Sequence, residues 1–167
     1  MNKKISFYLV LATVIMLSGS VVVFAKAGEV GEKHRSDVVK VVQELEKVAD
    51  KDEAIKDEVK TVAKEEDEMS KSVSDKIKKV EDRSGFKTFL IGSDYKSLGE
   101  LRSEIVTTEN RINRLTNALE RMTGTTTKAE LETQITELKT IQTKAESFIK
   151  AQEGKFSLFG WLVKMFQ

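Results

Sequence analysis

The chain has 167 residues, with no cysteine, no proline, one histidine and a formal net charge of +1. This length leaves room for one domain at most, and the lack of cysteine excludes disulfides and thiolate metal sites. The near-zero net charge argues against a nucleic-acid-binding protein, which normally carries a basic excess on one face. Because 33% of the residues are charged, glycine is scarce and proline is absent, the composition predicts an all-α fold built from long helices.

Residues 1–25 have the three parts of a signal peptide. Two lysines precede an apolar run over residues 5–17, and Val23 and Ala25 occupy the positions that a signal peptidase reads. We expect cleavage after Ala25, and the alternative is an uncleaved membrane anchor, since a bilayer span needs about 20 apolar residues. Both predict that the rest of the chain is exported across the cytoplasmic membrane, to be secreted or anchored at its outer face.

The next segments are expected to be a spacer and a long charged helix. Residues 26–35 contain glycine and alternating charges, which indicates a flexible spacer. A helical pattern follows in residues 36–92, with Ser36 as the expected N-cap. Its apolar positions step by three and four residues, and Asp52 and Glu66 interrupt them.

This helix is possibly broken near residues 50–52, because Asp50 and Glu53 could cap a second helix there. An unbroken helix would be much longer than the elements that follow it. Its remainder would then pair with another copy of the chain or stand as a solvated stalk. A homo-oligomer formed through the first helix is therefore one of the open alternatives.

Residues 93–153 are expected to form an antiparallel helical hairpin, resembling a coiled-coil bundle, with its turn at residues 123–127. Two capping boxes mark the expected helix starts: Ser97 with Glu100, and Thr127 with Glu130. When the chain is folded back at the turn, the apolar seams of the two helices meet in mirror order, with Leu115 opposite Ile135. The first seam consists of Leu98, Leu101, Ile105, Ile112, Leu115, Leu119 and Met122.

Closing this hairpin brings the phenylalanines of the exported part to its open end. Residues 154–167 are expected to form a short amphipathic helix rich in aromatic residues, which is too short to cross a bilayer. The candidate membrane-docking or partner-docking residues are Phe86, Phe89, Phe156, Phe159, Trp161, Leu162, Phe166, Lys155 and Lys164.

Three environments are open to this apolar end. In the first, the C-terminal helix packs on Phe86, Phe89, Leu90 and Phe148 as a small core. In the second, it lies in a membrane surface, where nearby lysines attract anionic headgroups. In the third, it binds another protein of the cell envelope.

Residues suited to catalysis or metal binding do not form a pattern in this sequence. His34 has no companions for a catalytic dyad or an imidazole metal cluster, and we expect it to be solvated. The acidic run at residues 65–68 lacks the glycine turn of a calcium loop and indicates a solvated helix face. The sequence therefore predicts no enzyme, no cofactor, no metal and no small-molecule substrate.

Three segments together resemble a group of uncharacterised short exported α-helical proteins predicted in small-genome, candidate-phylum bacteria. They are RSGFKTFLIGSDY at residues 83–95, the heptads of residues 98–115 and the aromatic tail of residues 156–166. The likeness covers about half of the chain, from residue 83 onward, and it rests on heptads and aromatic tails. It implies an exported helical protein and no particular activity.

Together these features predict a non-enzymatic structural or interaction protein of the cell envelope. Its aromatic-rich end would dock on the membrane surface or on another envelope protein. The alternative is a holdase chaperone outside the cytoplasm, whose helical arms would hold unfolded chains as they leave the export channel.

Overall fold

The structure is a computed structural model that describes residues 28–122, 124–155, 157 and 159. The predicted all-α class is confirmed, since the secondary structure of the described residues is helical and includes no strand. The helices are α2 (Glu29–Ala49), α3 (Lys56–Glu81), α4 (Gly85–Ile91), α5 (Tyr95–Arg121) and α6 (Thr125–Glu153). The signal segment, with Val23 and Ala25, lies outside the described residues.

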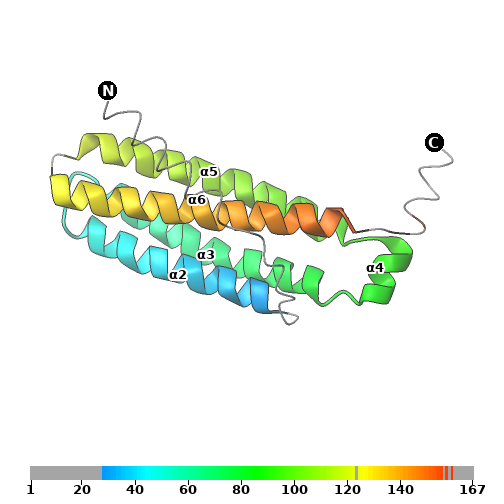
Figure 1. The fold of residues 1–167 in the computed structure, drawn as a ribbon. Helices are drawn as coiled ribbons and strands as arrows, with labels where there is room; N and C mark the ends of the chain where they lie inside the picture. Colours follow the sequence, from blue (N-terminus) through cyan, green and yellow to red (C-terminus); the bar gives the residue numbers. More distant parts are fainter. Residues whose placement is uncertain (1–27, 123, 156, 158, 160–167) are drawn as a thin grey trace, which may run out of the picture.

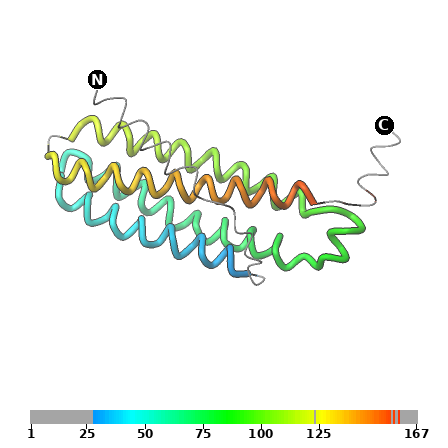
Figure 2. Tube along the Cα trace, in the orientation of Figure 1, coloured from blue at the N-terminus to red at the C-terminus, as the bar shows by residue number. Residues whose placement is uncertain are grey.

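The four long helices lie side by side, and the short α4 sits at one end of them (Figure 1). Each long helix packs on the next in chain order, and α6 packs on α2 to close the ring. Consecutive long helices run in opposite directions, so each long helix carries the chain back along the bundle (Figure 2). This closed arrangement lets every long helix bury one apolar face against two neighbours.

The first charged segment is two helices rather than one. The chain reverses between the end of α2 and the start of α3, so α3 packs along α2 instead of extending it. Asp50 and Glu53 do not cap the second helix, whose N-cap is Ile55 and has no side-chain cap. Asp52 stabilises the reversal instead, because its carboxylate accepts a hydrogen bond of 3.0 Å from the Ala54 amide.

The helix α2 begins earlier than its sequence indicates. It starts at Glu29, so most of the expected spacer is helical and Ser36 lies inside the helix rather than at its N-cap. The reason is a cap supplied from another helix. The Glu81 carboxylate of α3 accepts hydrogen bonds from the Val30 and Gly31 amides, at 3.4 and 3.3 Å. These amides belong to the first turn, where a helix lacks internal acceptors.

The second pair of helices also begins earlier than the capping boxes predict. Asp94 is the N-cap of α5 and accepts hydrogen bonds from the Ser97 amide at 3.2 Å and from the Ser97 hydroxyl at 2.9 Å. Ser97 is thus a buried residue of the first turn and not a cap. The helix α6 begins at Thr125, before Thr127, and has no side-chain cap.

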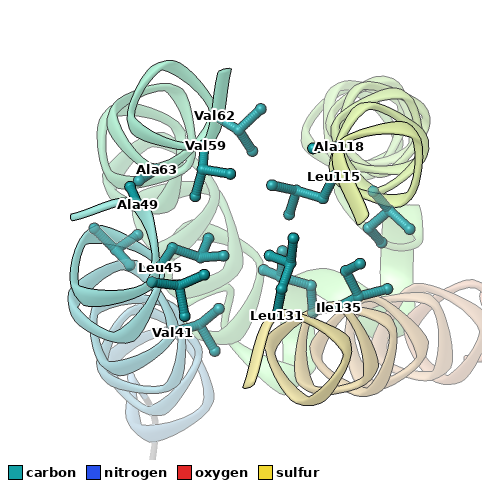
Figure 3. Close-up of a cluster of buried hydrophobic side chains, with 14 of the residues drawn as sticks. Val41, Leu45, Ala49, Val59, Val62, Ala63, Leu115, Ala118, Leu131 and Ile135 are labelled. Atoms are coloured by element: carbon teal, nitrogen blue, oxygen red, sulfur yellow. The ribbon is translucent and has the colours of Figure 1, made fainter. Parts of the chain in front are cut away.

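The buried apolar residues form two clusters along the bundle. The turn-end cluster surrounds Leu45, Leu115 and Leu131 near the two reversals of the chain, and its side chains point inward from all four long helices (Figure 3). The aromatic-end cluster consists of Met69, Val73, Ile77, Val80, Leu98, Leu101 and Ile149. Most of the predicted seam of α5 is buried in these clusters, which the three-four spacing anticipates.

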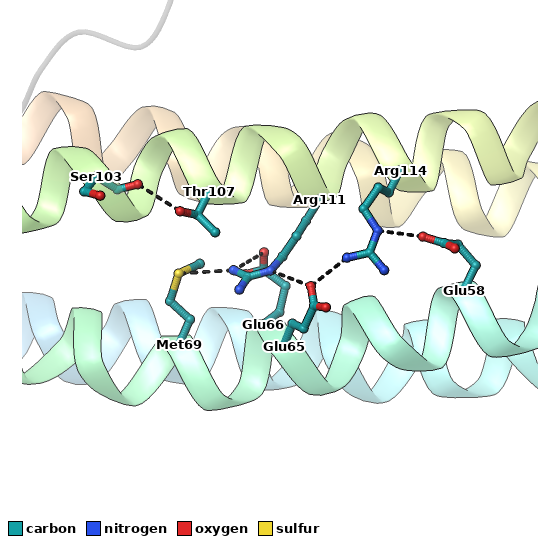
Figure 4. A network of polar contacts seen from close by, with 8 residues as sticks. All are labelled: Glu58, Glu65, Glu66, Met69, Ser103, Thr107, Arg111 and Arg114. Carbon is teal, nitrogen blue, oxygen red and sulfur yellow. Dashed lines mark hydrogen bonds and ion pairs between the residues drawn. The ribbon is translucent and has the colours of Figure 1, made fainter.

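A polar layer lies between the two clusters. Glu66 is only 3% exposed, and its carboxylate lies 3.4 Å from the Arg111 guanidinium of α5 (Figure 4). Burial raises the pKa of Glu66, and the Arg111 charge opposes this effect. Arg111 also reaches Glu65 at 3.0 Å. The acidic run is therefore not wholly a solvated face, because two of its carboxylates join α3 to α5.

His34 belongs to the same layer and is half-buried rather than solvated. It lines a cavity of about 30 Å³ in the bundle interior, together with Glu66, Thr108 and Gln142. A space of this size accommodates one or two water molecules rather than an organic ligand. Burial lowers the pKa of His34 to about 4, while Asp37 acts to raise it and Lys144 to lower it.

Candidate docking surface at the aromatic end

The starts of α2 and α5 and the ends of α3 and α6 lie at one end of the described bundle, which we call the aromatic end. The hydrogen bonds from Val30 and Gly31 to Glu81 place the start of α2 beside the end of α3. The Ser93 hydroxyl donates to the Gln152 carbonyl, which places the start of α5 beside the end of α6. The short α4 lies at this same end (Figure 1).

Local hydrogen bonds hold α4 across this end. Ser84 caps α4 by accepting a hydrogen bond of 3.2 Å from the Lys87 amide. Gly92 ends the helix with a φ of 85° and a ψ of −179°, a conformation that side chains disfavour. Beyond α6, the Ser157 hydroxyl donates to the Leu90 carbonyl at 3.3 Å. These contacts define both ends of α4, which we call the platform, and join it to the segment that follows α6.

Large apolar side chains on and beside this platform are exposed to solvent. Phe86 is 73% exposed, and it lies in solvent rather than in a local core. Phe89, Ile91, Tyr95 and Phe159 are also exposed, each by about half of its surface. By contrast, Phe148 is partly buried against the aromatic-end cluster. Exposed apolar side chains gathered in one region indicate an interaction surface, whereas scattered ones do not.

The predicted docking residues divide into those that the structure places and those outside the described residues. Phe86, Phe89 and Phe159 are exposed, and so is Lys155. The predictions for Phe156, Trp161, Leu162, Phe166 and Lys164, and for the C-terminal helix, lie outside the described residues. Sequence reasoning did not single out Ile91, although it lies beside the glycine that ends α4.

In the sequence around α4 and after α6, basic residues outnumber acidic ones. Residues 83–96 contain Arg83, Lys87 and Lys96 but a single acid, Asp94, and residues 155–167 contain two lysines and no acid. The Asp94 carboxylate is occupied in capping α5. Burial acts to raise the pKa of Asp94, but hydrogen bonds from Ser97 and the charges of Lys79 and Arg83 together hold this pKa below its ordinary value. Two exposed basic residues, Lys87 and Lys96, thus lie in the same part of the chain as the exposed aromatic residues.

The described part of the chain contains no group of three or more side chains suited to hold a metal ion. Among its helices, none is both long and apolar enough to cross a membrane. No protein-family model, curated protein or solved structure matches this chain. Inference about function therefore starts from the residues of the aromatic end.

Proposed function

We propose that the protein is a non-enzymatic structural or interaction protein of the cell envelope that docks on an anionic membrane surface. The observation that carries this proposal is the exposed position of Phe86, Phe89 and Tyr95 at one end of a closed bundle. Aromatic side chains favour the boundary between lipid headgroups and acyl chains. The bundle would stand on the membrane by this end.

Charge supports a membrane as the partner. Lys87 and Lys96 are exposed beside the aromatic residues, and Lys155 is exposed where the chain leaves the bundle. Each basic residue near an anionic leaflet contributes about 1 kcal/mol of attraction, and apolar insertion adds to it. A protein partner with an acidic apolar surface would meet the same side chains, and it is the competing outcome of the test below.

The topology supports the same orientation. Both apolar terminal segments, residues 1–25 and residues 156–166, join the described bundle at the aromatic end, because Gly28 precedes α2 and Lys155 follows α6. If the first segment remains as an anchor, it holds the patch beside the lipid. If it is cleaved, the patch and the C-terminal segment provide the attachment.

Liposome flotation tests this proposal. The chain from residue 26 onward is mixed with vesicles of equal parts phosphatidylcholine and phosphatidylglycerol, after circular dichroism has verified that it unfolds cooperatively. We expect it to float, and the Phe86→Ser/Phe89→Ser variant and a chain that ends at Glu153 to remain largely in the dense fraction.

Val106→Ser provides the matched control, because Val106 is an exposed apolar residue on the side of α5. We expect this variant to float like the unaltered chain. If the Phe86→Ser/Phe89→Ser variant also floats undiminished, the exposed aromatic residues are not a membrane-docking surface. The patch would then be tested as a protein-binding surface.

A further inference from the structure

A cleft opens beside the aromatic patch, where the last turns of α3 approach α4. Its volume is about 470 Å³. Four basic residues line it: Lys78, Lys79, Arg83 and Lys87. Lys87 belongs to α4, one residue after the exposed Phe86, so the cleft and the aromatic patch share one helix. A ligand in the cleft would therefore lie next to any lipid in contact with the patch.

Arg83 has an unpartnered donor in this region. Its Nε is buried and has no hydrogen-bond partner in the structure. Leaving a buried donor unsatisfied costs about 1–3 kcal/mol, so such groups in folded proteins normally find an acceptor. The guanidinium group presents its N–H donors in a planar fork that matches the oxygens of a phosphate. Arg83 also lines the cleft, so a phosphate there would bind the guanidinium, and a shift of this side chain would bring its buried donor to an acceptor.

The charges of the cleft are distributed unevenly. Lys78 lies 3.3 Å from Glu32, and Lys79 lies 3.9 Å from Asp94. Within the described ranges, neither Arg83 nor Lys87 has an ion-pair partner. Two further aspartates, Asp75 and Asp82, also line the cleft. The Arg83 charge also acts on Asp94, which lines the cleft as well. Of the four basic residues, Arg83 and Lys87 are thus the two without an ion pair, and both lie at or next to α4.

We infer that this cleft binds a phosphate group, held by Arg83 through its guanidinium fork and by Lys87 through its ammonium group. The inference deepens the proposed membrane docking and rests on it for the source of the phosphate, which is the headgroup of an anionic phospholipid. A soluble phosphate compound offers the same chemistry. The cleft would recognise the phosphate, and the aromatic residues of α4 would enter the adjoining acyl region.

Nuclear magnetic resonance of the ¹⁵N-labelled full chain in neutral maltoside micelles tests the site directly. Inorganic phosphate is the probe, and the signals followed are the Arg83 Nε–H and the amides of Ser84 and Lys87. We expect saturable shifts of these signals. Arg83→Lys keeps the charge but removes the fork, and we expect the amide shifts to require roughly tenfold more phosphate.

Lys96→Gln is the control, since it removes a positive charge outside the cleft, and its titration should stay within about twofold of the unaltered chain. The full chain is then placed in nanodiscs of phosphatidylcholine, with or without phosphatidylglycerol. Shifts of the same signals only in the phosphatidylglycerol discs support a lipid headgroup. Shifts with inorganic phosphate alone support a soluble phosphate compound bound in the same cleft.

Two results would overturn the inference: no saturable shift with either probe, or an Arg83→Lys chain that responds like the unaltered one. The second result would mean that the cleft attracts anions only through its overall charge. Flotation of the Phe86→Ser/Phe89→Ser variant tests membrane docking without altering Arg83. The failure of the phosphate site and the failure of the docking proposal are thus distinguishable.

Discussion

Gly92 ends α4 and starts the short turn that leads into α5. Its φ of 85° and ψ of −179° lie in a region that is essentially restricted to glycine. A Cβ at this position would also lie 3.2 Å from the Tyr95 ring and 3.5 Å from the Ser157 side chain. The conformation and the crowding together explain why this platform needs a glycine at the junction between α4 and α5.

We expect Gly92→Ala to lower the free energy of unfolding by about 1–3 kcal/mol, the usual cost of a strained backbone conformation. The measurement is equilibrium unfolding in urea. The matched control is Gly99→Ala, because Gly99 lies inside α5 with open space around its Cα. That change should raise the free energy of unfolding by about 0.5–1 kcal/mol. Equal effects of the two substitutions would contradict this account of Gly92.

His34 makes stability depend on pH in a defined window. Its pKa is about 4 in the folded protein, mainly because it is buried, against an ordinary value of 6.5. Protonation therefore favours the unfolded chain. The contribution of this residue is fully present above pH 6.5 and is lost as the pH falls toward 4, with a slope of at most about 1.4 kcal/mol per pH unit.

The difference in free energy of unfolding between the unaltered chain and His34→Gln isolates this contribution. Urea unfolding of both proteins from pH 8 to pH 4 should give a constant difference down to pH 6.5. Below that pH the unaltered chain should lose stability relative to the variant. A constant difference over the whole range would mean that the pKa of His34 is the same in the folded protein as in the unfolded chain.

At the scale of the helices, α3 and α5 are joined by ion pairs as well as by apolar contacts. Arg114 bridges Glu58 and Glu65, at 2.6 and 2.8 Å. Arg111 meets Glu65 and the buried Glu66 (Figure 4). Partly exposed pairs such as those of Arg114 contribute little. The buried pair is different, since removing one partner leaves a charge in the interior.

We expect Arg111→Leu to lower the free energy of unfolding at pH 8 by about 3–5 kcal/mol, because Glu66 loses its cation. The loss should shrink as the pH is lowered, since the raised pKa of Glu66 makes this carboxylate easier to neutralise. Adding Glu66→Leu should restore most of the stability at pH 8. The control is Arg102→Leu, whose side chain is 60% exposed, with an expected cost below about 1 kcal/mol. Similar losses for Arg111→Leu and Arg102→Leu would contradict the importance of burial.

The helices and their buried faces could be predicted from the sequence, whereas most of their starts could not. Apolar residues spaced by three and four residues sufficed to indicate the buried positions of α5, such as Leu101 and Leu115. The start of α2 depends on Glu81, a residue of another helix. The acidic run that contains Glu66 was expected to be solvated because the partner of Glu66, Arg111, is distant in sequence. Contacts between helices, which local patterns do not contain, account for both errors.

The candidate docking surface could likewise be predicted from the sequence only in part. The aromatic residues near α4 stood out in the sequence because they are few and grouped. The cleft did not, because it requires the turn between α3 and α4 to bring Lys79 and Arg83 close to Lys87 and Asp94. The start of α2 at this end was equally hidden, since its position depends on the reversal of the chain at residues 50–55.

For the molecule as a whole, the polar layer divides the core into unequal parts. Among the described residues, the turn-end cluster contains 18 buried apolar residues, whereas the aromatic-end cluster contains seven. Local opening is easiest where fewest apolar contacts must be broken. The aromatic end, where docking is proposed, should therefore open more readily than the rest of the bundle, although both ends are built from the same four helices.

Hydrogen exchange within a single helix tests this difference without comparing unlike elements. We expect the amides of residues 73–80 in α3, which belong to the aromatic-end cluster, to exchange at least roughly tenfold faster than those of residues 59–63 in the turn-end cluster. Filling the cavity with Thr108→Ile should reduce this difference in exchange rate, because it joins the two clusters with apolar contacts. Equal exchange along α3 would mean that the bundle opens as one unit despite its polar layer. In that case the aromatic end would meet its partner as a rigid surface, with no local opening to help it adapt.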